Sequence, residues 1–238
     1  MDTPVTDLLH LNALPDTPDT TLSSFSVTHA PPDLIRSVWA TLKLLAQGTP
    51  SLSYAPAHFS LVSPHTVTNA SSVYRVQTYL EEVTRAAFEV SSSLSYGSML
   101  AGGGSETDEY GDVGVWVGSL GKRDPKEVLQ NLGLDEWVKS NGGKIVEAAA
   151  SPSPLPSSLT SSSSQSMVSE TPKIHAESLS KLLNNLDSIM EFRVQGLPGG
   201  IVLFFFVGQL SEQSGGFSPE DGYAGLVGVG VMADGDDE

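Results

Sequence analysis

The sequence predicts an α+β fold, a single domain in which about four helices pack on a mixed or antiparallel sheet that includes a C-terminal hairpin. Valines alternate with Gly or Trp at residues 113–118 and with Gly at residues 227–231, which is the period of a β-strand. The run IVLFFFV at residues 201–207 is apolar without alternation, as in a strand that is covered on both faces. Elsewhere apolar residues recur three or four positions apart, as on one face of a helix. These helical segments lie around residues 34–45, 73–90 and 179–190.

Three of the predicted helices are recognised by this apolar spacing. The first follows a pair of prolines, with Asp33 as the expected N-cap, and ends at Gly48. The second is predicted at residues 71–91, and its continuous apolar stripe favours packing on the sheet. The last opens at Thr171, and its predicted apolar face runs as far as Met190.

The remaining helix has the strongest N-terminal signal. Asp124 is the expected N-cap, Pro125 occupies the first turn, and Glu127 completes a capping box. Residues 134–140 are predicted to continue it as a short second piece, which ends at a pair of glycines.

The strand candidates gather toward the C-terminal end of the chain. The loop between the last two candidates contains the turn residues of an antiparallel hairpin, and residues 191–196 are the expected third strand of a meander. We expect Phe204, Phe205 and Phe206 all to be buried, with Phe205 on the opposite face from its neighbours. The apolar run is too short for a membrane helix, which needs about 20 residues. The strand candidates are residues 57–63, 111–120, 144–150, 191–196, 201–207 and 222–232.

The domain is predicted to comprise residues 31–150 and 171–234, with two segments outside its core. Residues 1–30 resemble a mobile acidic arm, and the Ser/Pro-rich residues 151–170 a disordered insertion that cannot bury a core. Leu8 and Leu11 lie in an apolar part of the arm. That part either folds back on the domain or docks in the groove of a partner.

Composition excludes several classes of function. The net charge is −16, from 28 acidic and 12 basic residues, and no run of basic residues is present to bind a phosphate backbone or anionic lipids. A protein partner with a basic surface fits this charge better than a nucleic acid. The chain has no cysteine, which excludes disulfides and thiolate chemistry. Its first residues lack the basic and apolar regions of a secretory signal, so we expect a cytoplasmic or nuclear protein.

The Val/Gly strands supply the first candidate site. If their glycines share a face, that face has a shallow trough in which Trp116, Gly228 and Gly230 are candidate contacts for a ligand or partner. The other interpretation, a helix packed closely against bare backbone, is the one we favour.

The acidic loop at residues 101–112 supplies the second candidate site. Its three glycines lack the Gly-Lys-Ser/Thr ending of a phosphate-binding loop, and its carboxylates, Glu106, Asp108, Glu109 and Asp112, lack the spacing of an EF-hand. The five histidines are not at metal-ligand spacing. We therefore interpret the loop as a solvated acidic surface and predict neither a metal nor a cofactor.

These observations favour a non-enzymatic intracellular subunit or adaptor that binds other proteins in a complex. The alternative is a small-molecule-binding domain or enzyme that uses the glycine trough near Trp116 and the acidic loop at residues 106–112. A concave pocket with titratable groups would favour the alternative, and a convex surface with an apolar patch would favour the adaptor.

Overall fold

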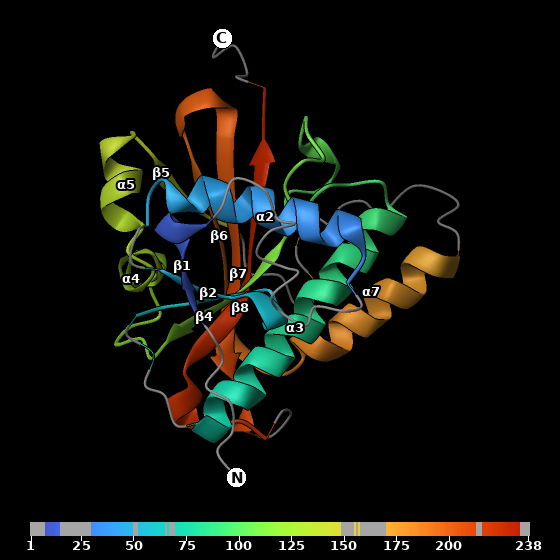
Figure 1. The fold of residues 1–238 in the computed structure, drawn as a ribbon, viewed down its shortest axis with the longest axis vertical. Helices are drawn as coiled ribbons and strands as arrows, with labels where there is room; N and C mark the ends of the chain where they lie inside the picture. The colour runs from blue at the N-terminus through green and yellow to red at the C-terminus, as the bar shows by residue number, and fades with distance from the viewer. Residues whose placement is uncertain are drawn as a thin grey trace.

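The computed structural model describes residues 8–14, 30–49, 52–64, 66, 70–148, 155, 157, 170–212 and 216–233. The described residues form one sheet of eight strands in the order β1-β2-β3-β4-β8-β7-β6-β5 (Figure 1). Only β3 and β4 pair in parallel among the described strands. The strands are β1 Leu9–His10, β2 Ser53–Ala55, β3 Ser60–Val62, β4 Val113–Gly118, β5 Lys144–Glu147, β6 Leu186–Gln195, β7 Ile201–Leu210 and β8 Tyr223–Val231.

Helices cover both faces of the sheet. The helices are α2 Pro32–Ala46, α3 Ala70–Ser93, α4 Pro125–Asn131, α5 Asp135–Ser140 and α7 Glu170–Leu183. Buried residues of α2, α4 and α5 belong to one core cluster, and buried residues of α3 and α7 belong to a second one on the other side. Figure 1 shows α2 crossing in front of the strands and α3 running beside α7. The predicted α+β fold with a mixed sheet is confirmed.

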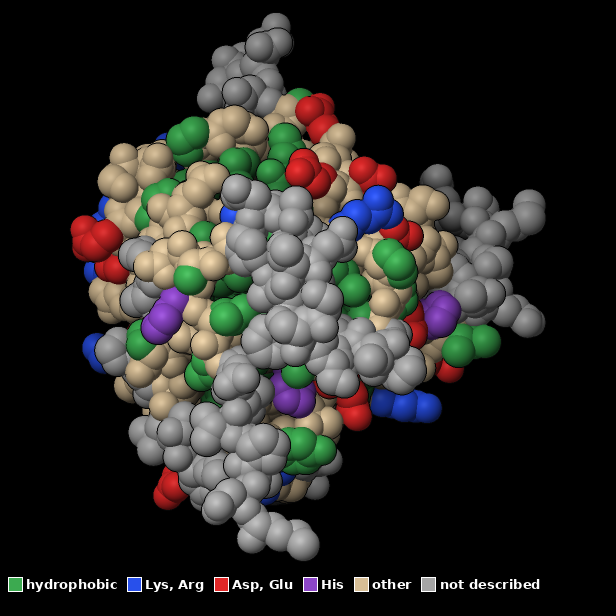
Figure 2. Space-filling view, in the orientation of Figure 1, with side chains coloured by type: hydrophobic (Ala, Val, Ile, Leu, Met, Phe, Trp, Pro, Cys, Tyr) green, Lys and Arg blue, Asp and Glu red, His purple; other side chains and the backbone are tan. Residues whose placement is uncertain are grey.

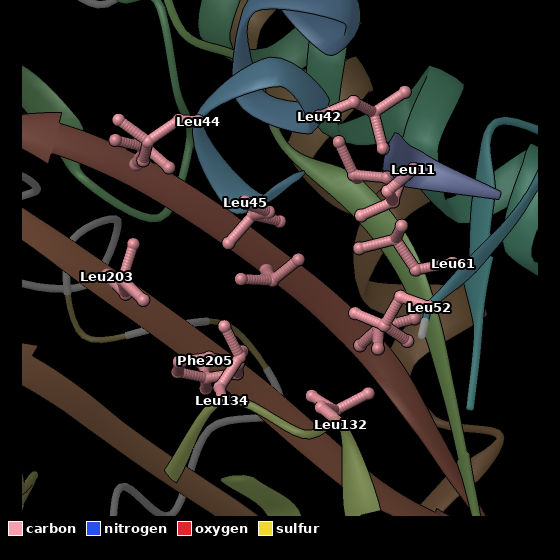
Figure 3. Close-up of a cluster of buried hydrophobic side chains, with 14 of the residues drawn as sticks. Leu11, Leu42, Leu44, Leu45, Leu52, Leu61, Leu132, Leu134, Leu203 and Phe205 are labelled. Atoms are coloured by element: carbon pink, nitrogen blue, oxygen red, sulfur yellow. The ribbon is translucent and has the colours of Figure 1, made fainter. Parts of the chain in front are cut away.

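The core cluster on the α2 face joins segments that are far apart in the sequence. Its leucines come from α2, from the N-terminal segment, from β3 and from the stretch that follows α4, and they meet Leu203 and Phe205 of β7 (Figure 3). Leu42, Leu45, Leu203 and Phe205 are at most 1% exposed. Burial of this kind stabilises a fold by about 25 cal/mol for each Å² of apolar surface.

Because successive side chains of a strand point to opposite faces of the sheet, those of β4 and β8 are divided between the two core clusters. Val113, Val115 and Val117 pack on the α2 face, whereas Trp116 packs on the α3 face. The strands pair antiparallel, with Val113 opposite Val227. Val113 therefore meets Val227 on the α2 face, where Gly225 lies opposite Val115, and Gly114, Gly228 and Gly230 share the other face with Trp116.

The predicted C-terminal hairpin and meander are present as β6, β7 and β8, which pair antiparallel in sequence order. Strand β7 lies between the other two. Phe205 packs on the α2 face and Phe206 on the α3 face, and both are buried. Phe204 shares the α3 face but is only half-buried, so the expectation that all three phenylalanines are buried is wrong at this residue.

The last helix is shorter than predicted. It ends at Leu183, and Leu186 already begins β6, where it pairs with Leu210. Ile189 and Met190 therefore belong to a strand and not to the apolar face of a helix. The apolar spacing of these residues wrongly indicated a helix, because β6 has an irregularity between Asp187 and Met190. Such an irregularity lets apolar residues at uneven intervals stay in contact with the core.

Two N-terminal caps differ in detail from the prediction. Helix α2 begins at Pro32, one residue before the expected cap Asp33. Asp124 caps α4 as predicted, accepting a hydrogen bond from N of Lys126 at 2.9 Å. The Glu127 carboxylate does not complete a capping box with Asp124, because it accepts from the backbone N–H groups of Gly121 and Lys122. It thus closes the loop that precedes the helix.

Part of the N-terminal segment lies on the domain. Residues Leu9–His10 pair with β2, and N of Leu11 donates to O of Leu52 at 3.0 Å. The remainder of the expected acidic arm and most of the Ser/Pro-rich insertion lie outside the described residues. None of the helices in the described part of the chain is long and apolar enough to cross a membrane.

Candidate functional site

The eight-stranded sheet ends at β5, a short strand that pairs only with β6 among the described strands. A tight turn after α5 directs the chain into this position. Gly143 is required there, because a Cβ would lie 2.8 Å from the side chain of Val138 and 3.0 Å from that of Leu197. The turn thereby places an exposed strand along the free edge of β6, and β5 becomes the outermost strand of the sheet.

The outer edge of β5 presents backbone groups without partners in the described ranges. N of Ala148 donates to O of Glu191 at 2.9 Å, which extends the pairing of β5 with β6 by one residue. Because backbone groups alternate between the two sides of an antiparallel strand, those of Ile145 and Glu147 point away from the sheet. Within the described ranges these outward groups accept and donate no hydrogen bond. The Ile145 side chain beside them is 39% exposed.

A groove of about 510 Å³ lies next to this edge. The half-buried Phe204 borders it, together with Val146 of β5, and Phe204 packs on the α3 side of the sheet. Arg193 and Glu191, which project from β6 beside β5, supply charges of both signs. The groove is thus an apolar surface with a charged border, adjoining the free strand edge.

The loop that borders the other end of the groove is held by Asp112. This carboxylate is 4% exposed and accepts hydrogen bonds from Oγ of Ser98 at 2.7 Å, N of Met99 at 2.6 Å and N of Leu100 at 3.3 Å. Burial raises the pKa of Asp112 to about 6, although these hydrogen bonds act to lower it. The carboxylate therefore fixes residues 98–100 over β8.

The face that carries Gly114, Gly228 and Gly230 is filled in the structure and has no open trough at these glycines. A Cβ on Gly114 would lie 3.0 Å from Cβ of Leu80 on α3. The Asp112 carboxylate and Ser98 cover Gly228, while Ala101 and Phe204 cover Gly230. A helix packed on bare backbone, the interpretation favoured from the sequence, describes Gly114, whereas Gly228 and Gly230 are covered by residues outside the helices.

Trp116 lies apart from the covered glycines Gly228 and Gly230. It pairs with Ala224 in the sheet, is 1% exposed, and donates from Nε1 to O of Asp221 at 2.7 Å. The structure therefore does not bring Trp116 together with the glycines of β8, and its indole anchors the start of β8 instead.

The two leucines proposed as partner contacts have opposite environments. Leu11 is 1% exposed and belongs to the core cluster of the α2 face. Leu8 is 45% exposed. Of this pair, only Leu8 is accessible from outside the domain.

The acidic loop does not bring its carboxylates together. Glu106, Asp108 and Glu109 are exposed, whereas Asp112 is buried and engaged with Ser98. The backbone of Glu106 donates to O of Val231 at 2.7 Å, which ties the loop to the end of β8. In the described part of the chain, no group of three or more His, Asp or Glu residues is arranged to hold a metal ion.

Among the described residues that are visible in Figure 2, Lys and Arg side chains do not gather into a basic patch. Figure 2 shows the Lys and Arg side chains of the described residues separated from one another around the visible face, with acidic side chains between them. The net charge of −16 is therefore not offset locally by a cationic surface in this view.

Comparison with known proteins returns no match: no family model, no curated protein and no solved structure matches this chain. The candidate site therefore depends on geometry alone.

Sequence reasoning did not identify the β5 edge or the groove. It predicted a strand at residues 144–150, but its periodicity cannot say whether a strand is central or outermost. The sequence pattern predicts a strand that contains Glu191 and Arg193, but it assigns these two residues no function. The available signal was the Lys-Ile-Val-Glu composition of β5, which is short and charged as edge strands often are.

Proposed function

We propose that this protein is a non-enzymatic binding subunit of a cytoplasmic or nuclear complex, and that it takes an extended segment of a basic partner protein along β5. The single observation that carries the proposal is the outer edge of β5, where the backbone groups of Ile145 and Glu147 have no partner among the described residues. A strand added there would form main-chain hydrogen bonds and extend the sheet.

Side chains near the edge supply a basis for specificity. Ile145 projects on the α2 face of β5, where it offers an exposed apolar contact to the neighbouring strand. The basic character of the partner rests on the net charge of −16, which accelerates encounter with a cationic protein.

A second candidate function is the binding of a small molecule in the groove beside Phe204. Its volume of about 510 Å³ is within the usual range of ligand pockets, about 300–1,000 Å³. This groove differs from the alternative derived from the sequence, because Leu100, Ala101 and Gly104 border it and neither Trp116 nor the acidic loop at residues 106–112 does. Its mixture of Arg193 and Glu191 fits a zwitterionic or amphipathic molecule better than a simple anion.

The decisive experiment changes the outer edge of β5 and leaves the rest of the fold intact. Ile145→Pro removes an outward N–H that β6 does not use, so β5 should remain paired, since proline is tolerated at strand edges. The probes are peptides from a displayed random library, selected for binding to the full chain. We expect Ile145→Pro to weaken the selected peptides at least about tenfold, which is the loss of about 1.4 kcal/mol, with no change in the melting temperature.

Val146→Pro is the matched control, because it removes an N–H that faces β6 and should destabilise the fold itself. Hydrogen exchange locates the contact: the amides of Ile145 and Glu147 should be protected when peptide is bound. Selected peptides that bind Ile145→Pro as tightly as the unmodified chain, or that protect other amides instead, would exclude the β5 edge as the binding site.

A further inference from the structure

Ser157, one of the two described residues between Ala148 and Glu170, contacts Glu191 of β6. Oγ of Ser157 donates to Oε1 of Glu191 at 2.5 Å, and N of Ser157 lies 3.1 Å and 3.4 Å from the two carboxylate oxygens. A backbone donor and a hydroxyl donor thus converge on one carboxylate. Hydrogen bonds to a charged group are about twice as strong as neutral ones.

Leu155 provides an apolar contact two residues earlier. It packs against the core cluster of the α3 face, the cluster that also receives Phe204. Ser157 itself borders the groove. Ser157 therefore lies where a ligand in the groove would approach, and Leu155 holds the same segment on the α3-face cluster.

We propose that Ser157 is a phosphorylation site, and that its modification releases Leu155 and Ser157 from the sheet and opens the groove beside Phe204. A protein kinase transfers the γ-phosphoryl group of ATP to Oγ of Ser157; the O–H bond breaks, the proton leaves, and ADP is the second product. The kinase acts on the undocked form, in which Oγ is free of Glu191, and the phosphate then prevents return.

Electrostatics gives the direction of this effect. A phosphoserine carries about −1.5 to −2 charges at pH 7 and no hydroxyl proton to donate, so it repels an adjacent carboxylate. The charged groups that border the groove with Ser157 are Glu191, Glu147 and Arg193. Two of the three are acidic, and Glu191 is the group that Ser157 contacts. Release is therefore favoured over capture of the phosphate by Arg193.

The absence of cysteine allows a direct assay. In the full-length variant Leu155→Cys, the rate at which a thiol reagent labels residue 155 reports how often this segment leaves the core cluster. Phosphoserine, introduced at position 157 by genetic encoding, should increase the labelling rate at least about tenfold, the effect of losing one charge-assisted hydrogen bond. Phosphoserine introduced at the exposed Ser140 of α5 instead is the matched control, with the same charge on a residue that does not border the groove, and should leave the rate nearly unchanged.

Charge reversal at Glu191, which Ser157 contacts, distinguishes release caused by repulsion from release caused by a general loss of packing. In the phosphoserine-157 chain, Glu191→Lys should restore slow labelling, because the new pair is attractive. Equal rates with and without phosphate would overturn the proposal, as would slower labelling that Arg193→Gln abolishes, which would mean capture by Arg193. This assay uses no partner or ligand, so its result is independent of whether β5 binds a strand.

Discussion

Asp112 lies directly against Gly228 across the α3 face of the sheet. A Cβ on Gly228 would overlap Oδ1 of Asp112 and would lie 2.6 Å from Oγ of Ser98. Because the same carboxylate accepts the backbone N–H groups of Met99 and Leu100, the absence of a side chain at residue 228 is what lets the loop settle on β8. One wall of the groove thus depends on a glycine in the middle of a strand.

Gly228→Ala should therefore destabilise the protein. The added methyl group must displace either the carboxylate or the serine hydroxyl, and overpacking of this kind costs about 1–3 kcal/mol. Chemical denaturation measures the loss as a lower midpoint with an unchanged slope. Gly104→Ala is the control, since no heavy atom lies within 4 Å of its added Cβ, and it should be nearly neutral. Equal stability of the two variants would show that the loop does not rest on Gly228.

Asp112 should stabilise the protein more at acid pH than at neutral pH, relative to Asp112→Asn. Its pKa of about 6 in the folded protein is above the ordinary value of 3.8, so folding favours its protonated form. The resulting stabilisation is complete below about pH 3.8 and is lost as the pH rises through about 6.

Urea denaturation of both proteins between about pH 3.5 and pH 7.5 checks this, because the acid limit then lies below the ordinary aspartate pKa of 3.8. The difference in unfolding free energy, unmodified protein minus Asp112→Asn, should fall by on the order of 3 kcal/mol across this range. Taking the difference removes the contribution of the other carboxylates. A difference that stays constant with pH would mean that Asp112 titrates normally.

Phe205→Ala and Phe204→Ala should have unequal effects. Phe205 is 1% exposed and stacks on Phe192 with ring centroids 4.7 Å apart, so its removal should cost about 3–5 kcal/mol. Phe204 is half-buried beside the groove, and its removal should cost clearly less. Thermal and urea unfolding of the isolated protein measure both. A large loss at Phe204 would show that this residue belongs to the core and not to a binding surface.

Calcium or magnesium should leave the melting temperature nearly unchanged. Glu106, Asp108 and Glu109 are exposed and do not converge with the buried Asp112, so these four carboxylates form no shared site for a cation. A native-state ligand at a hundredfold excess over its dissociation constant would add about 2.7 kcal/mol. Differential scanning fluorimetry with each cation makes the measurement. A shift of that size, abolished by Asp108→Asn, would contradict our interpretation of the loop.

The sequence predicted the elements well where local periodicity and caps agree. Asp124 and Pro125 located the start of α4, and the uninterrupted run at residues 201–207 indicated a strand covered on both faces, as β7 is. It failed at Leu186 and Met190, because their spacing satisfies a helix as well as an irregular strand. The pairing of Leu186 with Leu210, 24 residues later, decides between them, and no local pattern contains that pairing.

The candidate site was less predictable for the same reason. The sequence pointed to Gly228 and to Asp112 separately, but not to their contact, which joins a loop to a strand more than 100 residues away. It offered Trp116 as a candidate contact for a ligand or partner, and the structure buries that indole, whose Nε1 donates to O of Asp221.

By itself the sequence determined the fold class, the order of most strands and helices, and which side of β4 and β8 each residue faces. These follow from backbone geometry, since alternation in a strand and repetition in a helix involve only neighbouring residues. Only the tertiary structure decided that β5 ends the sheet, that the glycine face is filled, and that Asp112 is buried. Those properties depend on which distant segments exclude water from a given group, and burial of that kind arises only when the whole chain has packed.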